Sequence, residues 1–140
     1  KPRRTVRYGS PDLMTPNRSE SLQLAGLDKH DFEDFPVEAV IEAIHETHGP
    51  RMLAITLGSD GMLLAKGGEV FRRIPTAARE VFDVSGAGDT VISALTLALA
   101  AEASFEEAAA FANLAAGVVV GKVGTASASP EEILEAVPQE

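Results

Sequence analysis

The segment Met52–Leu57 is apolar at every position except Thr56. Because successive side chains of a strand point to opposite faces, an unbroken apolar run predicts a strand that is covered on both sides. Such strands lie in sheets with helices on both faces. This segment therefore predicts an α/β fold, in which helices flank a mainly parallel sheet.

Expected strands and helices alternate along the rest of the chain, as this fold requires. Asn17 and Glu20 stand at the spacing of a capping box, which predicts a helix start. An antiparallel hairpin is expected at one edge of the sheet, since Gly67 and Gly68 separate two apolar runs. The expected strands are Leu13–Thr15, Met62–Ala65 and Val70–Ile74, and further helices are expected to begin at Pro36, Thr90, Ser104 and Pro130.

Length and charge bound the class of protein. With 140 residues the chain is long enough for one domain with a core. Its net charge of −9 argues against nucleic acid and anionic membranes as partners, because both need a basic face. It has no cysteine, no apolar run of membrane-spanning length and no signal-peptide pattern, and a cytoplasmic location is expected. The basic start without Met suggests a fragment, with residues 1–12 as a linker or cut end.

The sequence Asp83-Val84-Ser85-Gly86-Ala87-Gly88-Asp89 runs directly into an apolar, alanine-rich helix. A glycine turn at a helix start presents free N–H groups at the positive end of the helix dipole, which predicts an anion site. A carboxylate beside a bound anion is electrostatically unfavourable, so Asp89 suggests a catalytic base. A purely structural glycine turn remains an alternative, and the Lys-Ser/Thr of a P-loop is absent.

Three other motifs have ordinary explanations when each is taken alone. The sequence from Thr56 through Gly58 and Ser59 to Gly61 would be a hairpin turn, although ligands gather at the carboxyl ends of strands in open α/β sheets. Asn17 and Glu20 would be a helix cap. Asn113 is a poor helix former inside a helical pattern, so it is either exposed or bound to something specific.

The histidines do not indicate a metal site, and Ser85 gives little support for a hydrolase site. His45 and His48 are near a helix C-terminus, where a solvated face explains both, and with His30 they have no metal-like spacing. Ser85 has no evident histidine partner. An acyl hydrolase that uses Ser85 is therefore a weaker hypothesis, which requires a histidine within hydrogen-bond reach.

Taken together, the motifs resemble the C-terminal half of a ribokinase-like (PfkB) carbohydrate kinase. Segment 15–20 is similar to the family's N-x-x-E motif, 56–61 to its T-x-G-x-x-G turn, 83–89 to its D-x-x-G-A-G-D signature and 121–125 to its closing segment. The four matches occur in the family's order. The resemblance implies a ribokinase-like layered fold, with residues 1–140 as the C-terminal nucleotide-binding part of the kinase domain.

The resemblance also implies a role for each matching residue. Asp89 matches the catalytic base, and Gly86, Ala87 and Gly88 match the anion hole. Asn17 and Glu20 match the pair that acts on Mg²⁺ through water. The positions that match the ATP site are Thr56, Gly58, Ser59, Gly61 and Asn113, and those that match a K⁺ loop found in some members are Asp83 and Ser85.

Within the family, Ser85, Thr90 and Val91 favour a resemblance to the bacterial D-β-D-heptose 7-phosphate kinases. That resemblance implies ATP-dependent conversion of the sugar phosphate to the 1,7-bisphosphate in ADP-heptose and lipopolysaccharide synthesis. It further implies a homodimer and a fused adenylyltransferase in the intact protein, and no activity of these residues alone. The alternatives are another sugar or nucleoside kinase of the family, and a non-catalytic fragment with the kinase fold.

Overall fold

The computed structural model describes residues 6–138, and the chain forms two compact units. The first unit contains residues 6–57 and 63–73, and the second contains 58–62 and 74–138. Residues 1–5 of the expected linker lie outside the described residues. None of the helices within 6–138 is both long and apolar enough to cross a membrane.

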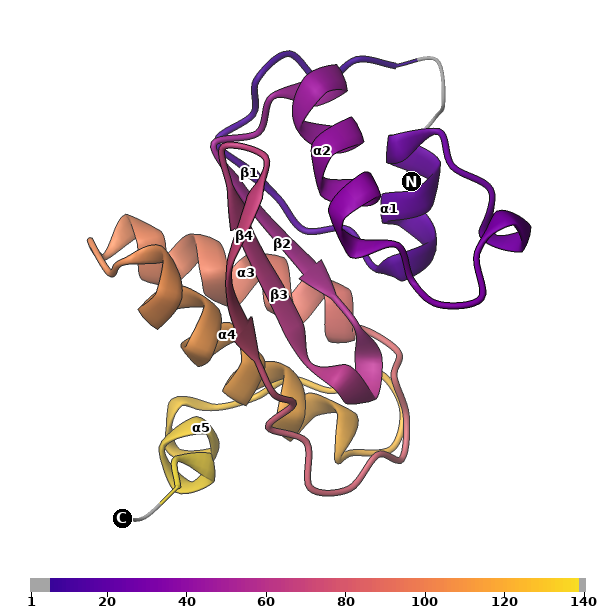
Figure 1. Ribbon diagram of the computed structural model, residues 1–140. Coiled ribbons are helices and arrows are strands. Elements are labelled where there is room, and N and C mark those ends of the chain that lie inside the picture. Colours follow the sequence, from indigo (N-terminus) through magenta and orange to yellow (C-terminus); the bar gives the residue numbers. More distant parts are fainter. Residues whose placement is uncertain (1–5, 139–140) are drawn as a thin grey trace. The chain divides into compact units, whose positions relative to one another are not determined.

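The first unit is built on a four-stranded sheet (Figure 1). Its strands are β1 (Leu13–Met14), β2 (Met52–Thr56), β3 (Met62–Lys66) and β4 (Glu69–Ile74), in the order β1-β2-β3-β4. β1 runs parallel to β2, with Leu13 opposite Met52. β3 and β4 form the expected antiparallel hairpin around Gly67 and Gly68, so the sheet is mixed.

Helices α1 (Arg18–Ala25) and α2 (Val37–His48) pack beside each other in this unit (Figure 1). The apolar stripe of α2, formed by Val40, Ile41 and Ile44, is fully buried in a core with Leu53 and Ile55 of β2. Spacing of three and four residues puts those side chains on one helix face. Burial of this stripe therefore holds the helix on the sheet. A short 3₁₀ helix, Lys29–Asp31, joins α1 to the segment before α2.

His48 lies inside this unit, so the expectation that a solvated face explains it is wrong. Its side chain is 5% exposed, and its Nδ1 accepts a hydrogen bond from the N–H of Tyr8 at 3.2 Å. Its Nε2 lies 3.3 Å from the carbonyl oxygen of Leu24. With Nδ1 as an acceptor, Nε2 carries the proton and donates it to Leu24. The ring thus joins the segment before β1 to α1 and α2, which the helical spacing of the sequence does not reveal.

The second unit contains α3 (Ala87–Ala100), α4 (Phe105–Val120) and α5 (Pro130–Ala136). α3 packs along α4, and α4 also contacts α5 (Figure 1). α4 begins with a capping box between Ser104 and Glu107, and α5 begins with one between Ser129 and Glu132. α3 begins at Ala87, three residues earlier than expected, because Gly86 serves as its N-cap in the left-handed conformation.

Candidate active site

Asn17 lies at the junction of β1 and α1, beside the end of β2. Its side-chain oxygen accepts from the N–H of Glu20 at 2.9 Å, and a carboxylate oxygen of Glu20 accepts from the N–H of Asn17 at 3.0 Å. Asn17 also forms an isolated parallel bridge with Thr56. The first unit therefore brings Asn17, Glu20 and Thr56 together at the carboxyl ends of two parallel strands, where ligands bind in open α/β sheets.

The predicted nucleotide turn is a single 3₁₀ turn, Gly58–Asp60, closed by a hydrogen bond from the N–H of Gly61 to the carbonyl of Gly58 at 3.0 Å. Gly61 has φ +81°, and a Cβ placed on it would lie 2.0 Å from the carbonyl oxygen of Ile74. No side chain fits there. The glycine at 61 is therefore required by the close approach of the chain after β4.

Asn113, half-buried on α4, reaches the same segment. Its Nδ2 donates to the carbonyl oxygen of Pro75 at 2.8 Å. The Pro75 carbonyl carbon is also the atom 2.7 Å from a Cβ placed on Gly61. Pro75 thus lies between α4 and the turn. The second unit gathers four of the residues predicted for ATP around this segment: Gly58, Ser59, Gly61 and Asn113.

The glycine turn lies at the N-terminus of α3. Gly86 has φ +81°, which favours glycine, and its carbonyl accepts from both the N–H and the hydroxyl of Thr90. Ala87 donates to the carbonyl of Val84 at 3.2 Å. The first N–H groups of a helix have no acceptor inside it. Those of Gly88 and Asp89 show no acceptor among residues 6–138, so they are the donors that could hold an anion.

Open space surrounds the first residues of this helix. A Cβ placed on Gly88 would meet nothing within 4 Å. Asp89 is exposed and forms no ion pair with another described residue. A base must reach the hydroxyl that it deprotonates, and its carboxylate must not be held by a cation of the protein. The surroundings of Asp89 meet both conditions.

Asp83 holds the opposite end of the turn. Its Oδ1 accepts from the N–H of Ser85 at 2.8 Å. Hydrogen bonds from Ser85, and a further one from the backbone of Gly124, lower the pKa of Asp83 below its ordinary value. Asp83 and Ser85, predicted for a K⁺ loop, therefore lie together with segment 121–125. In this arrangement the carboxylate of Asp83 already accepts a hydrogen bond from the backbone N–H of Ser85.

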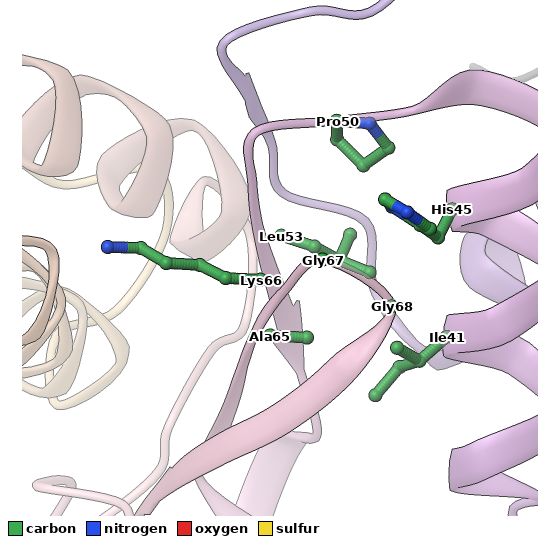
Figure 2. Close-up of a pocket in the computed structure, with 8 residues that line it drawn as sticks. All are labelled: Ile41, His45, Pro50, Leu53, Ala65, Lys66, Gly67 and Gly68. Carbon is green, nitrogen blue, oxygen red and sulfur yellow. The ribbon is translucent and has the colours of Figure 1, made fainter.

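Two surface hollows of the first unit lie elsewhere. Both are next to the β3–β4 turn, and no predicted site residue lines either of them. Figure 2 shows the smaller one, with His45 of α2 beside Gly68. A Cβ on Gly68 would lie only 3.1 Å from that ring, so there is little room for a ligand. The candidate residues therefore lie away from these hollows, at the strand ends in the first unit and at the glycine turn in the second.

Residues 4–132 match the pfkB family carbohydrate kinase domain. The chain belongs to the pfkB family of carbohydrate kinases. This membership confirms the resemblance and the ribokinase-like α/β fold expected from the four ordered motifs. The predicted roles of the individual site residues stay predictions.

The relatives that the chain resembles include bifunctional proteins. The chain is 47% identical over 127 residues to the bifunctional protein HldE of Desulfatibacillum aliphaticivorans, covering 91% of this chain and 26% of that protein. It is also 47% identical to the bifunctional protein HldE of Vibrio parahaemolyticus, covering 94% of this chain and 27% of that protein. The chain thus spans about a quarter of the length of these curated relatives.

Solved structures of the same fold include two ribokinases. The Arabidopsis thaliana ribokinase, complexed with ribose and ATP, superposes with a TM-score of 0.77 at 29% identity, over 92% of this chain and 41% of that one. The Thermotoga maritima ribokinase gives 0.76 at 30% identity, over 90% of this chain and 42% of that one.

Sequence reasoning missed the residues that support the site. Pro75 contributes only its backbone, so its side chain gives no signal. Gly117 does leave a signal in the sequence, because it is a glycine within a helical pattern, four residues after Asn113 on α4. A Cβ on Gly117 would lie 3.0 Å from the backbone of Ala77, so this glycine lets α4 approach the segment after Pro75.

Proposed function

We propose that the full-length protein transfers the γ-phosphoryl group of MgATP to a hydroxyl of a sugar phosphate. The observation that carries this proposal is the exposed carboxylate of Asp89, directly after the Gly86–Gly88 turn at the start of α3. Membership of the carbohydrate kinase family and the ATP complex of a similar ribokinase support it.

In the proposed reaction, the sugar hydroxyl attacks the γ-phosphorus in line with the leaving oxygen. The bond between that phosphorus and the β–γ bridging oxygen breaks, and ADP leaves. Asp89 accepts the hydroxyl proton. The N–H groups at the start of α3 stabilise the charge that spreads over the transferring group, with the positive end of the helix dipole behind them.

The donor set of Asn17 and Glu20 fits a magnesium ion that keeps its water. Both side chains carry oxygen atoms, the ligands that Mg²⁺ prefers, and each already accepts a backbone hydrogen bond. Contact through water leaves those bonds in place. When bound, the ion neutralises charge on the phosphates of ATP.

We propose D-glycero-β-D-manno-heptose 7-phosphate as the acceptor and the 1,7-bisphosphate as the product. Ser85, within the signature, and Val91, two residues after it, support this choice, as does the high identity to the bifunctional HldE proteins. By the same likeness, we propose an adenylyltransferase domain in the full-length protein, and a homodimer. Because the chain spans about a quarter of those relatives, the activity is proposed for the full-length protein.

A substrate panel tests the proposal. The full-length enzyme is assayed for ADP release with MgATP and, in separate reactions, the heptose 7-phosphate, fructose 6-phosphate, ribose and adenosine. We expect the highest kcat/KM with the heptose phosphate, and a new anomeric phosphate signal by ³¹P NMR. Preference for another acceptor would overturn the substrate assignment. ADP release with none of them, together with no MgATP binding by calorimetry, would favour a non-catalytic role.

A further inference from the structure

We propose that Lys122 is a positioning residue, which holds the glycine turn in place. Its ammonium group binds both Glu132 and the carbonyl of Ser127 in the connection between α4 and α5, and we call this pair of bonds the clip. This inference rests on the proposed phosphoryl transfer for its effect on rate. It concerns a side chain to which none of the family motifs assigns a role.

Lys122 joins three parts of this connection. It follows directly after Gly121, the C-cap of α4. Its Nζ lies 2.6 Å from Oε1 of Glu132 on α5 and donates to the carbonyl oxygen of Ser127 at 2.7 Å. The two side chains of the ion pair are only 33% and 40% exposed. The lysine therefore closes a loop from the end of α4 to the first turn of α5.

The first part of this loop, residues 120–125, contacts the glycine turn at several points. The carbonyl of Val120 accepts from the N–H groups of Phe82 and Asp83 at 2.8 and 3.3 Å. The backbone of Gly124 is close enough to the carboxylate of Asp83 to contribute to its lowered pKa. The methyl group of Thr125 lies 3.6 Å from a Cβ placed on Gly86. The segment from Val120 to Thr125 is thus one wall of the turn, and Lys122 is at its centre.

A simple ion pair on the surface would do little here, because exposed pairs contribute about 0–1 kcal/mol to folding. Lys122 differs because it also donates to a backbone carbonyl five residues ahead. The lysine accordingly lowers the pKa of Glu132, with help from the N–H of Ser129. We therefore expect the clip to restrain a short loop more than it stabilises the whole fold.

Restraint of this kind acts on catalysis through geometry. A displacement of about 1 Å in a group that faces the reacting atoms can lower a rate by about 100-fold. The N–H groups at the start of α3 act on charge that develops in the transition state, more than on bound ATP. Loss of the clip should therefore lower kcat and leave the KM for ATP nearly unchanged.

Five variants of the full-length enzyme test the proposal. Lys122→Met removes the ammonium group, and Lys122→Arg keeps the positive charge and has N–H donors for both acceptors. Glu132→Gln weakens the ion pair but keeps a side chain that can complete the capping box of α5. Glu131→Gln is the matched charge control on the same turn of α5. Ser129→Ala removes the helix cap and leaves both partners of the ion pair in place.

We expect Lys122→Met to lower kcat about 10-fold or more, with the KM for ATP within about twofold. Glu132→Gln should lower kcat in the same direction, and Lys122→Arg should restore most of the rate. Glu131→Gln and Ser129→Ala should keep nearly the full kcat. A wild-type kcat for Lys122→Met would overturn the proposal. So would equal losses for Ser129→Ala and Glu132→Gln, because the helix cap would then explain the effect.

Amide hydrogen exchange without substrate separates this inference from the proposed function. If the clip holds the turn, the hydrogen-bonded amides of Ser85, Ala87 and Thr90 exchange faster in Lys122→Met than in the wild type, while those of α2 are unchanged. Equal exchange at the turn would overturn the clip. An enzyme that transfers no phosphate but shows the faster exchange would overturn the proposed function and support the clip.

Discussion

The side-chain amide of Asn113 donates a hydrogen bond to the carbonyl oxygen of Pro75 at 2.8 Å, across a sequence separation of 38 residues. This bond fastens α4 to the segment that packs against Gly61 in the predicted nucleotide turn. The asparagine thus has a structural partner as well as its predicted place beside the nucleotide.

Replacement of Asn113 by Asp should weaken ATP binding. The carboxylate has nearly the same shape but no donor, so the bond to Pro75 is lost and two oxygens face each other. The net value of one hydrogen bond is about 1 kcal/mol, which corresponds to a rise of about fivefold in the KM for ATP. Steady-state kinetics of the full-length enzyme measure this KM. An unchanged KM would show that the bond does not support the nucleotide site.

Gly61→Ala should destabilise the protein strongly, because its Cβ would overlap the carbonyl oxygen of Ile74 in a backbone with φ +81°. We expect a loss of more than about 2 kcal/mol in the free energy of unfolding. Gly58→Ala is the matched control, since Gly58 has φ +63° and open space around it. It should lose only about 1 kcal/mol. Denaturant unfolding of both variants gives the comparison, and equal losses would contradict the packing argument.

Glu102→Gly should stabilise the protein. Glu102 follows the end of α3 with φ +65°, a conformation that costs a residue with a Cβ about 1 kcal/mol or more relative to glycine. We expect a gain of up to about 1 kcal/mol. Ala100→Gly, an exposed site within α3, serves as the opposite control and should lose about 1 kcal/mol. Thermal unfolding curves decide between gain and loss at position 102.

The glycine turn should loosen in acid because of Asp83. Its pKa in the folded protein lies below its ordinary value of 3.8, chiefly because the backbone of Ser85 donates to it. A group with a lowered pKa contributes stability above the ordinary value, and loses it as the pH falls through the folded value. The Ser85 amide signal in NMR should therefore shift as the pH falls below about 4. In Asp83→Asn this shift should be absent, and its persistence would contradict the assignment.

The sequence predicted the elements well where local patterns determine them. The capping-box spacing at Asn17 and the expected helix start at Ser104 are predictions that the structure confirms. The apolar run at Met52 correctly predicted a buried strand. These features depend on spacing within a few residues, so they can be read directly from the chain.

Long-range contacts were not predictable in this way. His48 looked exposed because it ends a helix beside polar neighbours, yet Tyr8 and Leu24 bind both of its ring nitrogens. α3 begins three residues before its apolar run, because a left-handed Gly86 can begin a helix that propensity alone would not start. The bond between Asn113 and Pro75 involves a backbone carbonyl, which every residue carries, so no sequence pattern marks it.

Phosphate transfer by the full-length Asp89→Asn enzyme is the most direct test of the account. Asn has the shape of Asp but cannot accept the hydroxyl proton. General-base catalysis contributes about 10²- to 10⁴-fold, so kcat should fall by that factor. Binding of MgATP, measured by calorimetry, should stay close to that of the wild type. A variant that turns over at nearly the normal rate would contradict the role of Asp89 and, with it, the proposed site.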